Sequence, residues 1–351
     1  MNFYKNNIKH IAVILLVSSF STIQMSFSQT KDVKVSKVWE TSEHNAFTDL
    51  VYFNDRFYCT FREAAGHVPK SNAEDGKIRV LESKDGKKWK SVALLEKDKY
   101  DLRDSKLSVT PDGRLMVLMG GSVYEDGKFI SRLNHVSFFD PKKNDFSELQ
   151  PVNMDERIKS PGDWLWRVTW KDGTGYGIVY RKMDKSGSMA YLVSTKDGIN
   201  YSLIYALDVF GLPGESTVDF INDEMIILMR RDGEGQYGYW GKSNPPYTTW
   251  DWTDMEYRLG GPDMIQTSNG KIVVGTRSFS DNMRENPKTS LYLSDENGRM
   301  ELLLTLPSGG DTSYPGMVEH DGKLWVSYYS SHEGKSNIYL AEIPLNYLGS
   351  K

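Results

Sequence analysis

Two residues with catalytic potential stand immediately before strand-like runs. Tyr314 lies in DTSYPGM, and Glu215 lies in PGEST. A tyrosine hydroxyl has a pKa of about 10, so it becomes an effective nucleophile only when a neighbouring base takes its proton. A glutamate is a suitable base. A neutral phenol also suits attack on a carbon that bears a carboxylate, because an attacking Asp or Glu would be repelled by the like charge.

Arginines near the ends of several strand-like runs supply the matching positive charge. The planar guanidinium can hold a carboxylate through two parallel hydrogen bonds. Arg230 and Arg231 are adjacent in one such run, and alternation along a strand lets only one of them face a ligand. The candidates at these run ends are Arg62, Arg181, Arg230, Arg231 and Arg277.

Six hairpin-like segments must position these residues. Each segment consists of an apolar strand, a tight turn of Asp, Asn and Gly, and a second apolar strand. They span residues 49–62, 106–120, 167–181, 216–231, 263–278 and 316–330. The strand ends recur at roughly fifty to sixty residues, which is the scale of a propeller blade. We therefore predict an all-β fold, a six-bladed β-propeller. Seven short blades, or five blades with an additional hairpin, are the alternatives.

The shared pattern of the segments indicates which residues meet at one axial mouth, where propellers bind ligands. Counting back equally from Arg230 and from Tyr329 reaches the starts of two blades, at Glu215 and Tyr314. We therefore expect these two residues at corresponding positions of the fourth and sixth blades. The same offset selects, in the first two blades, Phe47 and Ser105 with its neighbours Arg103 and Asp104.

Three further turns share a pattern of Ser or Thr, Asp and Gly. SKDGKKW (83–89) and STKDGINY (194–201) resemble the Asp-box, in which a Ser/Thr and an Asp lock a turn and an aromatic residue packs beneath it. SDENGRM (294–300) is a copy without its aromatic residue. Asp-boxes are structural and lie on the outer part of a blade. We therefore assign Asp85 and Asp197 to turn stabilisation.

With the Asp-boxes and four short motifs, the chain resembles the sialidase (exo-α-sialidase, neuraminidase) superfamily. The motifs are GEST, LMRR, GTRSF and TSYPGM, and the repeat extends the resemblance over nearly the whole chain after residue 28. The resemblance implies a retaining exo-glycosidase that releases a terminal acidic sugar. It makes Tyr314 the nucleophile and Glu215 its base. Arg230 or Arg231, together with Arg277, match two of the family's three carboxylate-binding arginines.

The opening of the first blade departs from this resemblance. The family has an Arg-Ile-Pro motif there, whereas this chain reads HNAFTDL (44–50), without a guanidinium. Arg62 and Arg167 are the candidate substitutes. The family's general acid is an Asp in the loop after the first blade's second strand. The candidates in this loop are Asp75, which we favour, Glu63 and His67.

Other residues near the mouth are predicted to contact substrate. The second blade opens with DLRDSKLSV, which resembles the family's opening there, and it brings Arg103 and Asp104 to the mouth. Trp164 and Trp166 precede the third blade's strand and are candidates for stacking on a sugar. We include Trp166 among the substrate contacts. The alternative is that both tryptophans fill seams between blades.

The N-terminus has the pattern of a secretory signal peptide. Lys5 and Lys9 precede the apolar run IAVILLV, and Ser26 and Ser28 form a small-x-small cleavage site. The apolar run is too short to span a membrane. We predict residues 1–28 as the signal peptide and 29–351 as a single propeller domain, exported to the periplasm or the cell exterior.

Composition narrows the remaining possibilities. Cys59 is the only cysteine, so no intramolecular disulfide can form. The six histidines show no metal-ligand spacing, and we predict neither metal nor other cofactor. A formal net charge of −4 does not suggest nucleic acid as a partner. We expect a monomer acting on a glycan or glycoconjugate. The alternatives are a non-catalytic glycan-binding propeller, or a hydrolase or lyase for a different acidic sugar.

Overall fold

The computed structural model describes residues 32–69, 75–125, 128–182, 188–233, 237–280 and 285–349. The predicted signal peptide, residues 1–28, lies outside the described residues. Asp32–Lys351 is one compact unit. The regular secondary structure of the described residues consists of β-strands and the short 3-10 helix η2 (Leu345–Leu348). It contains no helix that is long and apolar enough to cross a membrane.

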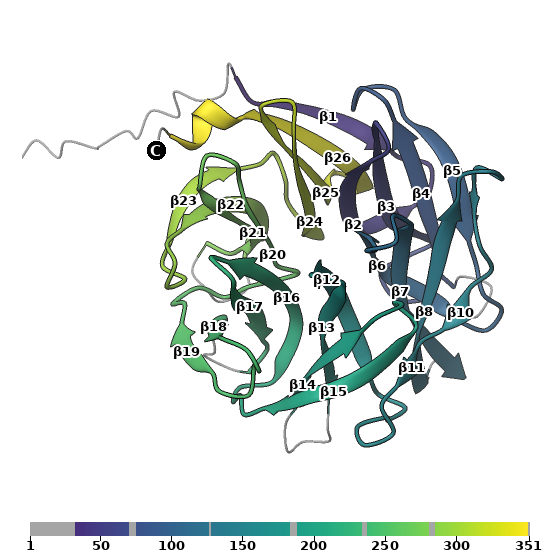
Figure 1. Cartoon of the computed structure of the whole chain (residues 1–351). Coiled ribbons are helices and arrows are strands. Elements are labelled where there is room, and N and C mark those ends of the chain that lie inside the picture. The colour runs from purple at the N-terminus through teal and green to yellow at the C-terminus, as the bar shows by residue number, and fades with distance from the viewer. Residues whose placement is uncertain are drawn as a thin grey trace, which may run out of the picture. The chain divides into compact units, whose positions relative to one another are not determined.

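The strands of Asp32–Lys351 form six blades arranged as a β-propeller, which confirms the predicted fold (Figure 1). Blade one contains β2 (His44–Phe53), β3 (Arg56–Ala64), β4 (Lys77–Ser83) and β5 (Lys90–Leu95). Blade two contains β6 (Asp101–Val109), β7 (Leu115–Glu125), β8 (Lys128–Asp140) and β10 (Gln150–Pro151), with β9 (Asp145–Phe146) also paired to β8. Blade three contains β12 (Trp164–Lys171), β13 (Thr174–Lys182), β14 (Ser188–Thr195) and β15 (Asn200–Leu207), with β11 (Asn153–Met154) parallel to β15.

The remaining three blades complete the ring. Blade four contains β16 (Pro213–Ile221), β17 (Glu224–Arg231), β18 (Tyr239–Ser243) and β19 (Asp251–Asp254). Blade five contains β20 (Asp263–Gln266), β21 (Ile272–Ser278), β22 (Lys288–Ser294) and β23 (Met300–Thr305). Blade six contains β24 (Thr312–His320), β25 (Lys323–Glu333), β26 (Lys335–Pro344) and, from the N-terminal side of the chain, β1 (Lys34–Trp39).

Strand β1 closes the ring by completing the last blade. It pairs antiparallel with β26, from Lys34 opposite Glu342 to Trp39 opposite Ile338. A single parallel pairing, His44 with Ser336, also joins blade six to blade one. The first and last strands of the propeller are therefore held in the same sheet. This arrangement covers the edge of β26, which would otherwise expose unpaired backbone groups.

The turns between the two innermost strands of each blade explain the hairpin pattern. Asn54 and Asp55 both have positive φ, at 47° and 58°, and Asn222 and Asp223 do so at 50° and 66°. Two-residue turns of this kind match the twist of the flanking strands and favour Asn, Asp and Gly. The same residue types therefore mark the same place in the repeat.

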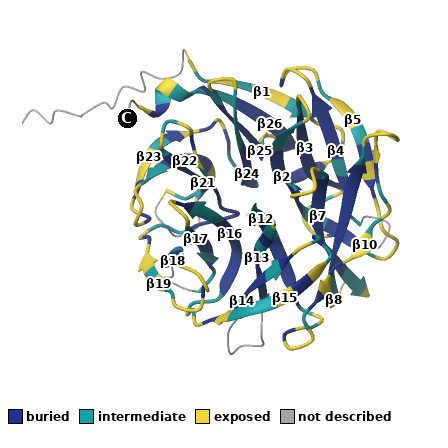
Figure 2. Ribbon diagram, in the orientation of Figure 1, coloured by how far each residue is buried: buried dark blue, intermediate teal, exposed yellow. Residues whose placement is uncertain are grey.

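Apolar side chains of neighbouring blades pack in shared buried clusters. The inner strands of the blades are largely coloured as buried in Figure 2. Ile78 of blade one packs in one cluster with Val117 of blade two. Ile178 of blade three shares another cluster with Ile227 of blade four. The seam of blades six and one continues toward the axis as the cluster that includes Tyr314. Burial is thus distributed around the ring, and the candidate tyrosine lies at the inner end of one seam.

The two outer turns assigned to structure are held as expected by their aspartates. Asp85 Oδ1 accepts hydrogen bonds from the backbone N–H groups of Lys87 and Lys88, at 2.9 and 3.0 Å. These backbone bonds lower the pKa of Asp85. Asp197 Oδ1 accepts from the N–H groups of Ile199 and Asn200, both at 2.8 Å.

Each of these turns also contacts the preceding blade through its glycine. Gly86 and Gly198 have positive φ, 69° and 78°. A Cβ on Gly86 would lie 2.4 Å from the Trp325 ring of blade six, and one on Gly198 would lie 2.4 Å from Met116 Sδ of blade two. Only glycine combines this backbone conformation with so close an approach. The outer turns therefore tie each of these blades to its neighbour.

Candidate active site

A bulge in the innermost strand of each blade aims side chains into the mouth of the propeller. In five blades two residues of this strand stand opposite one residue of the second strand. In blade five, the bond from Arg277 N–H to Gly260 O continues the ladder past Gly261 and Pro262 in the same way. Bulges of this kind re-aim side chains and are common beside active sites. The first residues of the six bulges are Phe47, Asp104, Trp166, Gly214, Gly261 and Tyr314.

The bulges correct one detail of the alignment made from the sequence. Tyr314 corresponds to Gly214, so Glu215 is one residue beyond the expected position. The blade-four hairpin runs from Ser216 to Ile221 between bulge and turn, whereas the blade-six hairpin runs only from Gly316 to His320. Counting a fixed number of residues from the strand ends could not detect this difference. In blade two the longer turn likewise makes Asp104, not Ser105, the counterpart of Tyr314.

Tyr314 and Glu215 meet at a cavity of about 260 Å³ at this mouth. The Tyr314 hydroxyl donates to Glu215 Oε1 across 2.8 Å. Arg230 Nη1 lies 2.9 Å from both carboxylate oxygens of Glu215. Arg230 is in turn held by Asp232 Oδ1, at 2.9 Å from Nε and 2.8 Å from Nη2. The phenol thus faces a carboxylate whose position is fixed by a charged hydrogen bond.

Aromatic side chains and a glycine fix the plane of the Tyr314 ring. Phe47 and Trp166 pack against it, with ring centroids 4.9 and 5.3 Å away. Gly261 lies beneath the ring, since a Cβ there would be 2.5 Å from it. Burial raises the pKa of Tyr314 well above its usual range, and the charge of Glu215 raises it further, whereas Arg230 opposes the shift. The free phenol is therefore protonated and needs a base to become a nucleophile.

Arg230 and Arg231 point to opposite sides, as strand alternation predicts. Arg230 lines the cavity. Arg231 is 1% exposed and belongs to the blade interior, where Nη2 lies 2.6 Å from Asp254 and Nε donates to Tyr237 O. Its guanidinium also lies over the Tyr239 ring at 3.3 Å. Of the two, the structure brings only Arg230 to Tyr314.

Arg277 approaches the cavity from blade five. Its Nε donates to Thr312 O at 2.7 Å, and its Nη2 donates to the Tyr329 hydroxyl at 3.1 Å. The guanidinium also lies over the Tyr314 ring, 5.7 Å from the centroid. These contacts hold Arg277 beside the candidate nucleophile.

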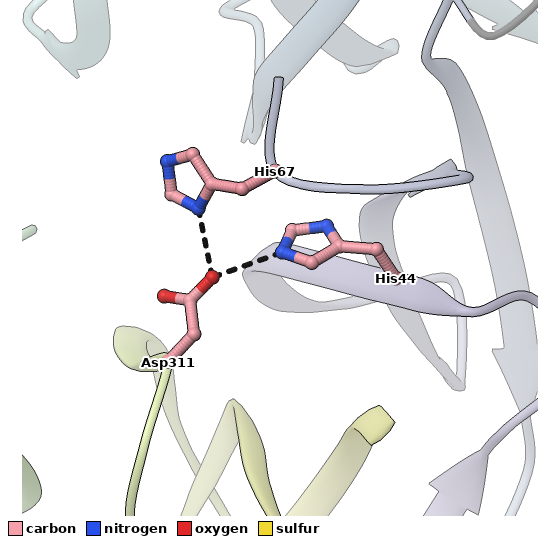
Figure 3. Close-up of side chains that lie close together, drawn as sticks. All are labelled: His44, His67 and Asp311. Carbon is pink, nitrogen blue, oxygen red and sulfur yellow. Dashed lines mark hydrogen bonds and ion pairs between the residues drawn. The ribbon is translucent and has the colours of Figure 1, made fainter. Parts of the chain in front are cut away.

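A cluster of two histidines and an aspartate occupies the place where the resemblance expected an arginine. Asp311 Oδ2 lies 2.9 Å from His44 Nε2 and 2.7 Å from His67 Nδ1 (Figure 3). Its other oxygen accepts from the Tyr329 hydroxyl at 2.8 Å. Burial alone would raise the pKa of Asp311, but the bonds from His44 and His67 bring it below its usual range. The opening of blade one therefore contributes imidazole in place of guanidinium.

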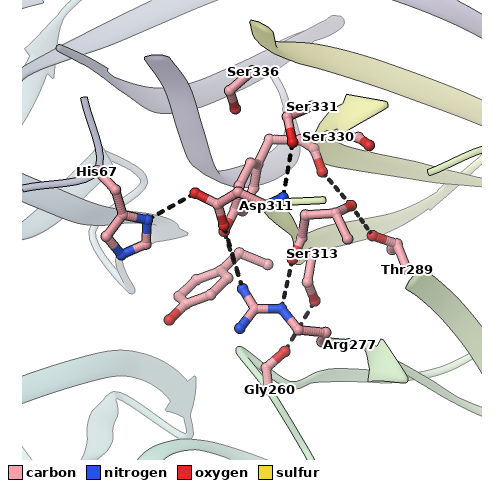
Figure 4. Close-up of polar contacts among 12 residues, drawn as sticks. His67, Gly260, Arg277, Thr289, Asp311, Ser313, Ser330, Ser331 and Ser336 are labelled. Carbon is pink, nitrogen blue, oxygen red and sulfur yellow. Dashed lines mark hydrogen bonds and ion pairs between the residues drawn. The ribbon is translucent and has the colours of Figure 1, made fainter. Parts of the chain in front are cut away.

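Blade six holds Asp311 from below this cluster. The backbone N–H of Asp311 donates to the Ser331 hydroxyl at 2.8 Å, and Arg277 Nη2 lies 3.9 Å from Asp311 Oδ1 (Figure 4). The two imidazole nitrogens and the carboxylate oxygen lie within 4.8 Å of one another, a grouping that the sequence spacing did not reveal. Both nitrogens are at hydrogen-bond distance from one oxygen, with the positive Arg277 nearby. We therefore interpret the cluster as a carboxylate that accepts N–H bonds.

The candidates for the general acid are placed differently from one another. Asp75 is half-buried near Asp101 and Arg62, and it is not among the residues that line the cavity. Glu63 is bound to Arg79 and to Trp39, and it is not among the residues that line the cavity. By contrast, Asp104 and His67 both line the cavity. Burial raises the pKa of Asp104 to about 6.

Two of the arginines predicted to contact substrate are occupied by internal partners. Arg62 is fully buried and binds Asp101 Oδ1 at 2.6 Å. Arg167, near the axis, lies 3.2 Å from both Asp49 and Asp263. Neither arginine lines the cavity, so neither supplies the missing guanidinium.

Two further predicted contacts form the floor and one side of the site. Trp166 is 1% exposed and packs beneath Tyr314, with the Lys106 ammonium 4.5 Å from its ring. It supports the Tyr314 ring and is too deeply buried to be a stacking surface for sugar. Arg103 does line the cavity, and its Nη2 binds Asp101 Oδ2 at 2.7 Å and His67 O at 2.9 Å.

Sequence reasoning missed several residues that line the cavity. Arg132 comes from the third strand of blade two, outside the hairpin pattern on which the alignment relied. The aromatic residues Tyr124 and Tyr180 also line it, as does Asp232, two residues after Arg230. Asp232 could have been found from the sequence LMRRD, since an arginine at a functional site commonly has a carboxylate partner.

Comparisons with known proteins support the fold and leave the chemistry open. No family model and no curated protein matches the chain. A crystal structure of a protein of unknown function from Dyadobacter fermentans has a TM-score of 0.74 at 15% identity, covering 90% of this chain and 100% of that one. Trypanosoma rangeli sialidase, in complex with 2,3-difluorosialic acid, has a TM-score of 0.66 at 12% identity, covering 88% of this chain and 59% of that one.

A third similar structure has a different activity. The GH93 α-L-arabinofuranosidase of Fusarium graminearum, in complex with arabinobiose, has a TM-score of 0.64 at 15% identity, covering 89% of this chain and 98% of that one. The fold is therefore a sialidase-like propeller, and the chain spans about three fifths of the length of the trypanosomal sialidase. Because one scaffold carries several activities, the function has to be argued from the site.

Proposed function

We propose that the protein is a retaining exo-glycosidase of the sialidase type, which releases a terminal acidic sugar from a glycan. The observation that carries the proposal is the 2.8 Å hydrogen bond from the Tyr314 hydroxyl to Glu215 Oε1, at the mouth of a propeller. The outer turns around Asp85 and Asp197 fit the Asp-boxes of that superfamily, with Ser83 and Thr195 bonding to them. An acidic sugar fits a cavity that several arginines line.

In this proposal the phenol of Tyr314 attacks the anomeric carbon while Glu215 accepts its proton. A bond forms between the tyrosine oxygen and that carbon, and the bond to the leaving oxygen breaks. Water then attacks the same carbon and gives a proton to the conjugate base of the general acid, while the bond between that carbon and the tyrosine oxygen breaks. Glu215 returns its proton to the departing phenolate, which restores the tyrosine. Arg230 holds the Glu215 carboxylate in place for this role through a charged hydrogen bond.

The general acid must protonate the leaving oxygen from the cavity side. We propose Asp104 for this role in place of Asp75. Asp104 lines the cavity, no described residue forms a hydrogen bond with its carboxyl group, and its pKa of about 6 keeps part of it protonated near neutral pH. His67 is the alternative, since it also lines the cavity.

Turnover of 4-methylumbelliferyl glycosides by the wild type and by Tyr314→Phe tests the proposal. We expect release of the fluorophore from an α-sialoside or from another acidic glycoside, and a loss of at least about a thousandfold in Tyr314→Phe. The covalent intermediate predicts that a 2,3-difluoro sugar labels Tyr314, which peptide mass spectrometry can locate.

Each alternative gives a different result in the same assays. Binding of acidic glycans without turnover would favour a non-catalytic propeller, which is the second candidate because Glu215 is already paired with Arg230. An unsaturated product that absorbs in the ultraviolet would indicate a lyase. Turnover that Tyr314→Phe leaves intact would keep the glycosidase and reject its nucleophile.

Export is a separate part of the proposal. We propose cleavage after Ser28 and release of residues 29–351 as a single, monomeric propeller domain outside the cytoplasm. Mass spectrometry of the mature protein should give a chain that begins at Gln29. A chain that keeps residues 1–28 in the periplasmic or culture fraction would contradict the assignment.

A further inference from the structure

One wall of the cavity is rich in hydrogen-bond donors that have no partner. Arg132, Trp164 and Tyr180 line the cavity from blades two and three, together with Ser122 and Tyr124. Arg132 Nε and Trp164 Nε1 are both buried, and neither has a hydrogen-bond partner among the residues that the structure describes. Within the described parts of the chain, no side-chain hydrogen bond is formed by Ser122 or by the hydroxyls of Tyr124 and Tyr180. Buried donors without acceptors are costly, so this wall is suited to a ligand that supplies acceptors.

Arg132 differs from the other arginines of the cavity in its charge balance. Arg230 is bound by Glu215 and Asp232, and Arg103 is bound by Asp101. Arg277 lies 3.9 Å from Asp311. No described carboxylate forms an ion pair with Arg132. The charge of Arg132 is therefore the least compensated of the four. An anion beside it would be attracted by a positive charge that no described carboxylate neutralises.

Packing holds Arg132 in place without neutralising it. Its guanidinium lies over the rings of Trp164 and Phe129, 5.0 and 4.9 Å from their centroids. Trp164 is 3% exposed and fits against Gly120, where a Cβ would lie 2.2 Å from the indole. The glycine of β7 thus admits the tryptophan that positions the arginine. This arrangement is preorganised, because it fixes the donors before a ligand arrives.

We propose that this wall, the Arg132–Trp164–Tyr180 site, binds an oxyanion carried by the sugar, either a carboxylate or a sulfate ester. The inference rests on the proposed function in that it describes the substrate of the same cavity. It differs in placing the negative group at blades two and three, away from the Arg230 and Arg277 pair. Asp104 lines the same cavity, and its ionised form would repel an anion. The position of the anion therefore depends more strongly on attraction by Arg132.

Calorimetric titration of the Tyr314→Phe protein tests the site without depending on turnover. The probes are N-acetylneuraminate, glucuronate and galactose 6-sulfate, with galactose as the neutral control. We expect at least one anionic probe to bind more tightly than galactose. Arg132→Met should weaken that probe about tenfold or more, and Arg132→Lys should weaken it less. The probe that responds distinguishes carboxylate from sulfate.

Matched variants test whether the anion binds at this wall or at the Arg277 side of the cavity. Trp164→Phe keeps an aromatic ring but removes the N–H and the outer part of the indole that packs on Gly120, so it should weaken the same probe by a smaller factor than Arg132→Met. Trp250→Phe, at the Trp252 stack in the outer part of blade four, should leave binding unchanged. Anionic binding that is lost in Arg277→Met and kept in Arg132→Met would overturn the proposal. So would equal affinity for anionic and neutral probes. Loss of binding in Arg132→Met would support the site even if the wild type hydrolyses no glycoside.

Discussion

Phe47 and Tyr314 occupy the same place in neighbouring blades. Each is the first residue of a bulge, with φ of 63° and 52°, and their rings lie 4.9 Å apart. Phe47 packs with His44 and His67, whereas the Tyr314 hydroxyl reaches Glu215 of blade four. One backbone conformation thus serves packing in blade one and proposed chemistry in blade six. The difference lies in one hydroxyl and in the partner that a non-adjacent blade provides.

Blades one and six also differ at the second-strand residue that is paired just before the bulge. Arg62 in blade one and Tyr329 in blade six stand at equivalent ends of the second strand. Arg62 is buried in an ion pair with Asp101. Tyr329 instead donates to Asp311 and accepts from Arg277, beside the cavity. Blade one therefore uses this position to stabilise the fold, and blade six connects it to the site.

Removing the partner of Tyr314 should make it chemically similar to Phe47. We expect Glu215→Gln to lower kcat by about 10² to 10⁴, because the phenol then keeps its proton at neutral pH. Steady-state kinetics on the best fluorogenic substrate measures the loss. Glu224→Gln, on the same hairpin but next to its turn, is the control and should retain activity. A Glu215→Gln enzyme within a factor of three of the wild type would remove Glu215 from the mechanism.

The strand-end residues should separate stability from activity. Arg62→Met removes one of the two arginines that pair with the buried Asp101 in the described part of the chain, and we expect it to lower the free energy of unfolding by about 3 kcal/mol. Tyr329→Phe loses hydrogen bonds to Asp311 and Arg277, and it should cost about 1 kcal/mol while raising KM. Urea denaturation and steady-state kinetics measure the two effects. Equal stability losses in the two variants would contradict the distinction between the blades.

Asp104, the equivalent bulge residue of blade two, should make the free energy of unfolding depend on pH. Its folded-state pKa of about 6 lies above the unfolded value of about 3.9, so the folded state holds the proton more tightly. Stability from this group is complete below about pH 4 and is lost as the pH rises through about 6. Asp104→Asn should therefore nearly match the wild type at pH 4 and exceed its free energy of unfolding by about 3 kcal/mol at pH 7.5. Denaturation at both pH values checks the sign.

The fold was predictable because its signals are local. Each ND, DG or NG turn marks a hairpin by its backbone requirement, and the recurrence of six hairpins favours a six-bladed propeller. Tyr314 and Glu215 followed from the same repeat, although the longer blade-four hairpin displaced Glu215 by one residue. Alternation along the strand predicted that Arg230 and Arg231 would diverge. These inferences required only periodicity within one hairpin.

The rest of the site depends on contacts between blades, which no local pattern encodes. His44 and Asp311 meet although 267 residues separate them, and the imidazole cluster was therefore not visible in the sequence. Arg132 lies on a third strand, for which the hairpin repeat gives no position. Arg62 and Arg167 looked like substitutes for a missing arginine, but burial commits both to internal carboxylates. Residue types indicated which chemistry was possible. Packing between blades determined which side chains line the cavity and which are paired inside the protein.

Exchanging the two aromatic residues gives the most direct test of the comparison. Phe47→Tyr alone should change kcat by less than about twofold, because the added hydroxyl joins a site that keeps Tyr314 and Glu215. The double variant Phe47→Tyr, Tyr314→Phe should remain as inactive as Tyr314→Phe. It has a tyrosine in an equivalent bulge, but the Phe47 ring packs against His67, at 5.3 Å, and His44, at 6.0 Å, whereas Glu215 bonds to the Tyr314 hydroxyl. Recovery of activity in the double variant would show that the bulge, and not the pairing with Glu215, makes the nucleophile.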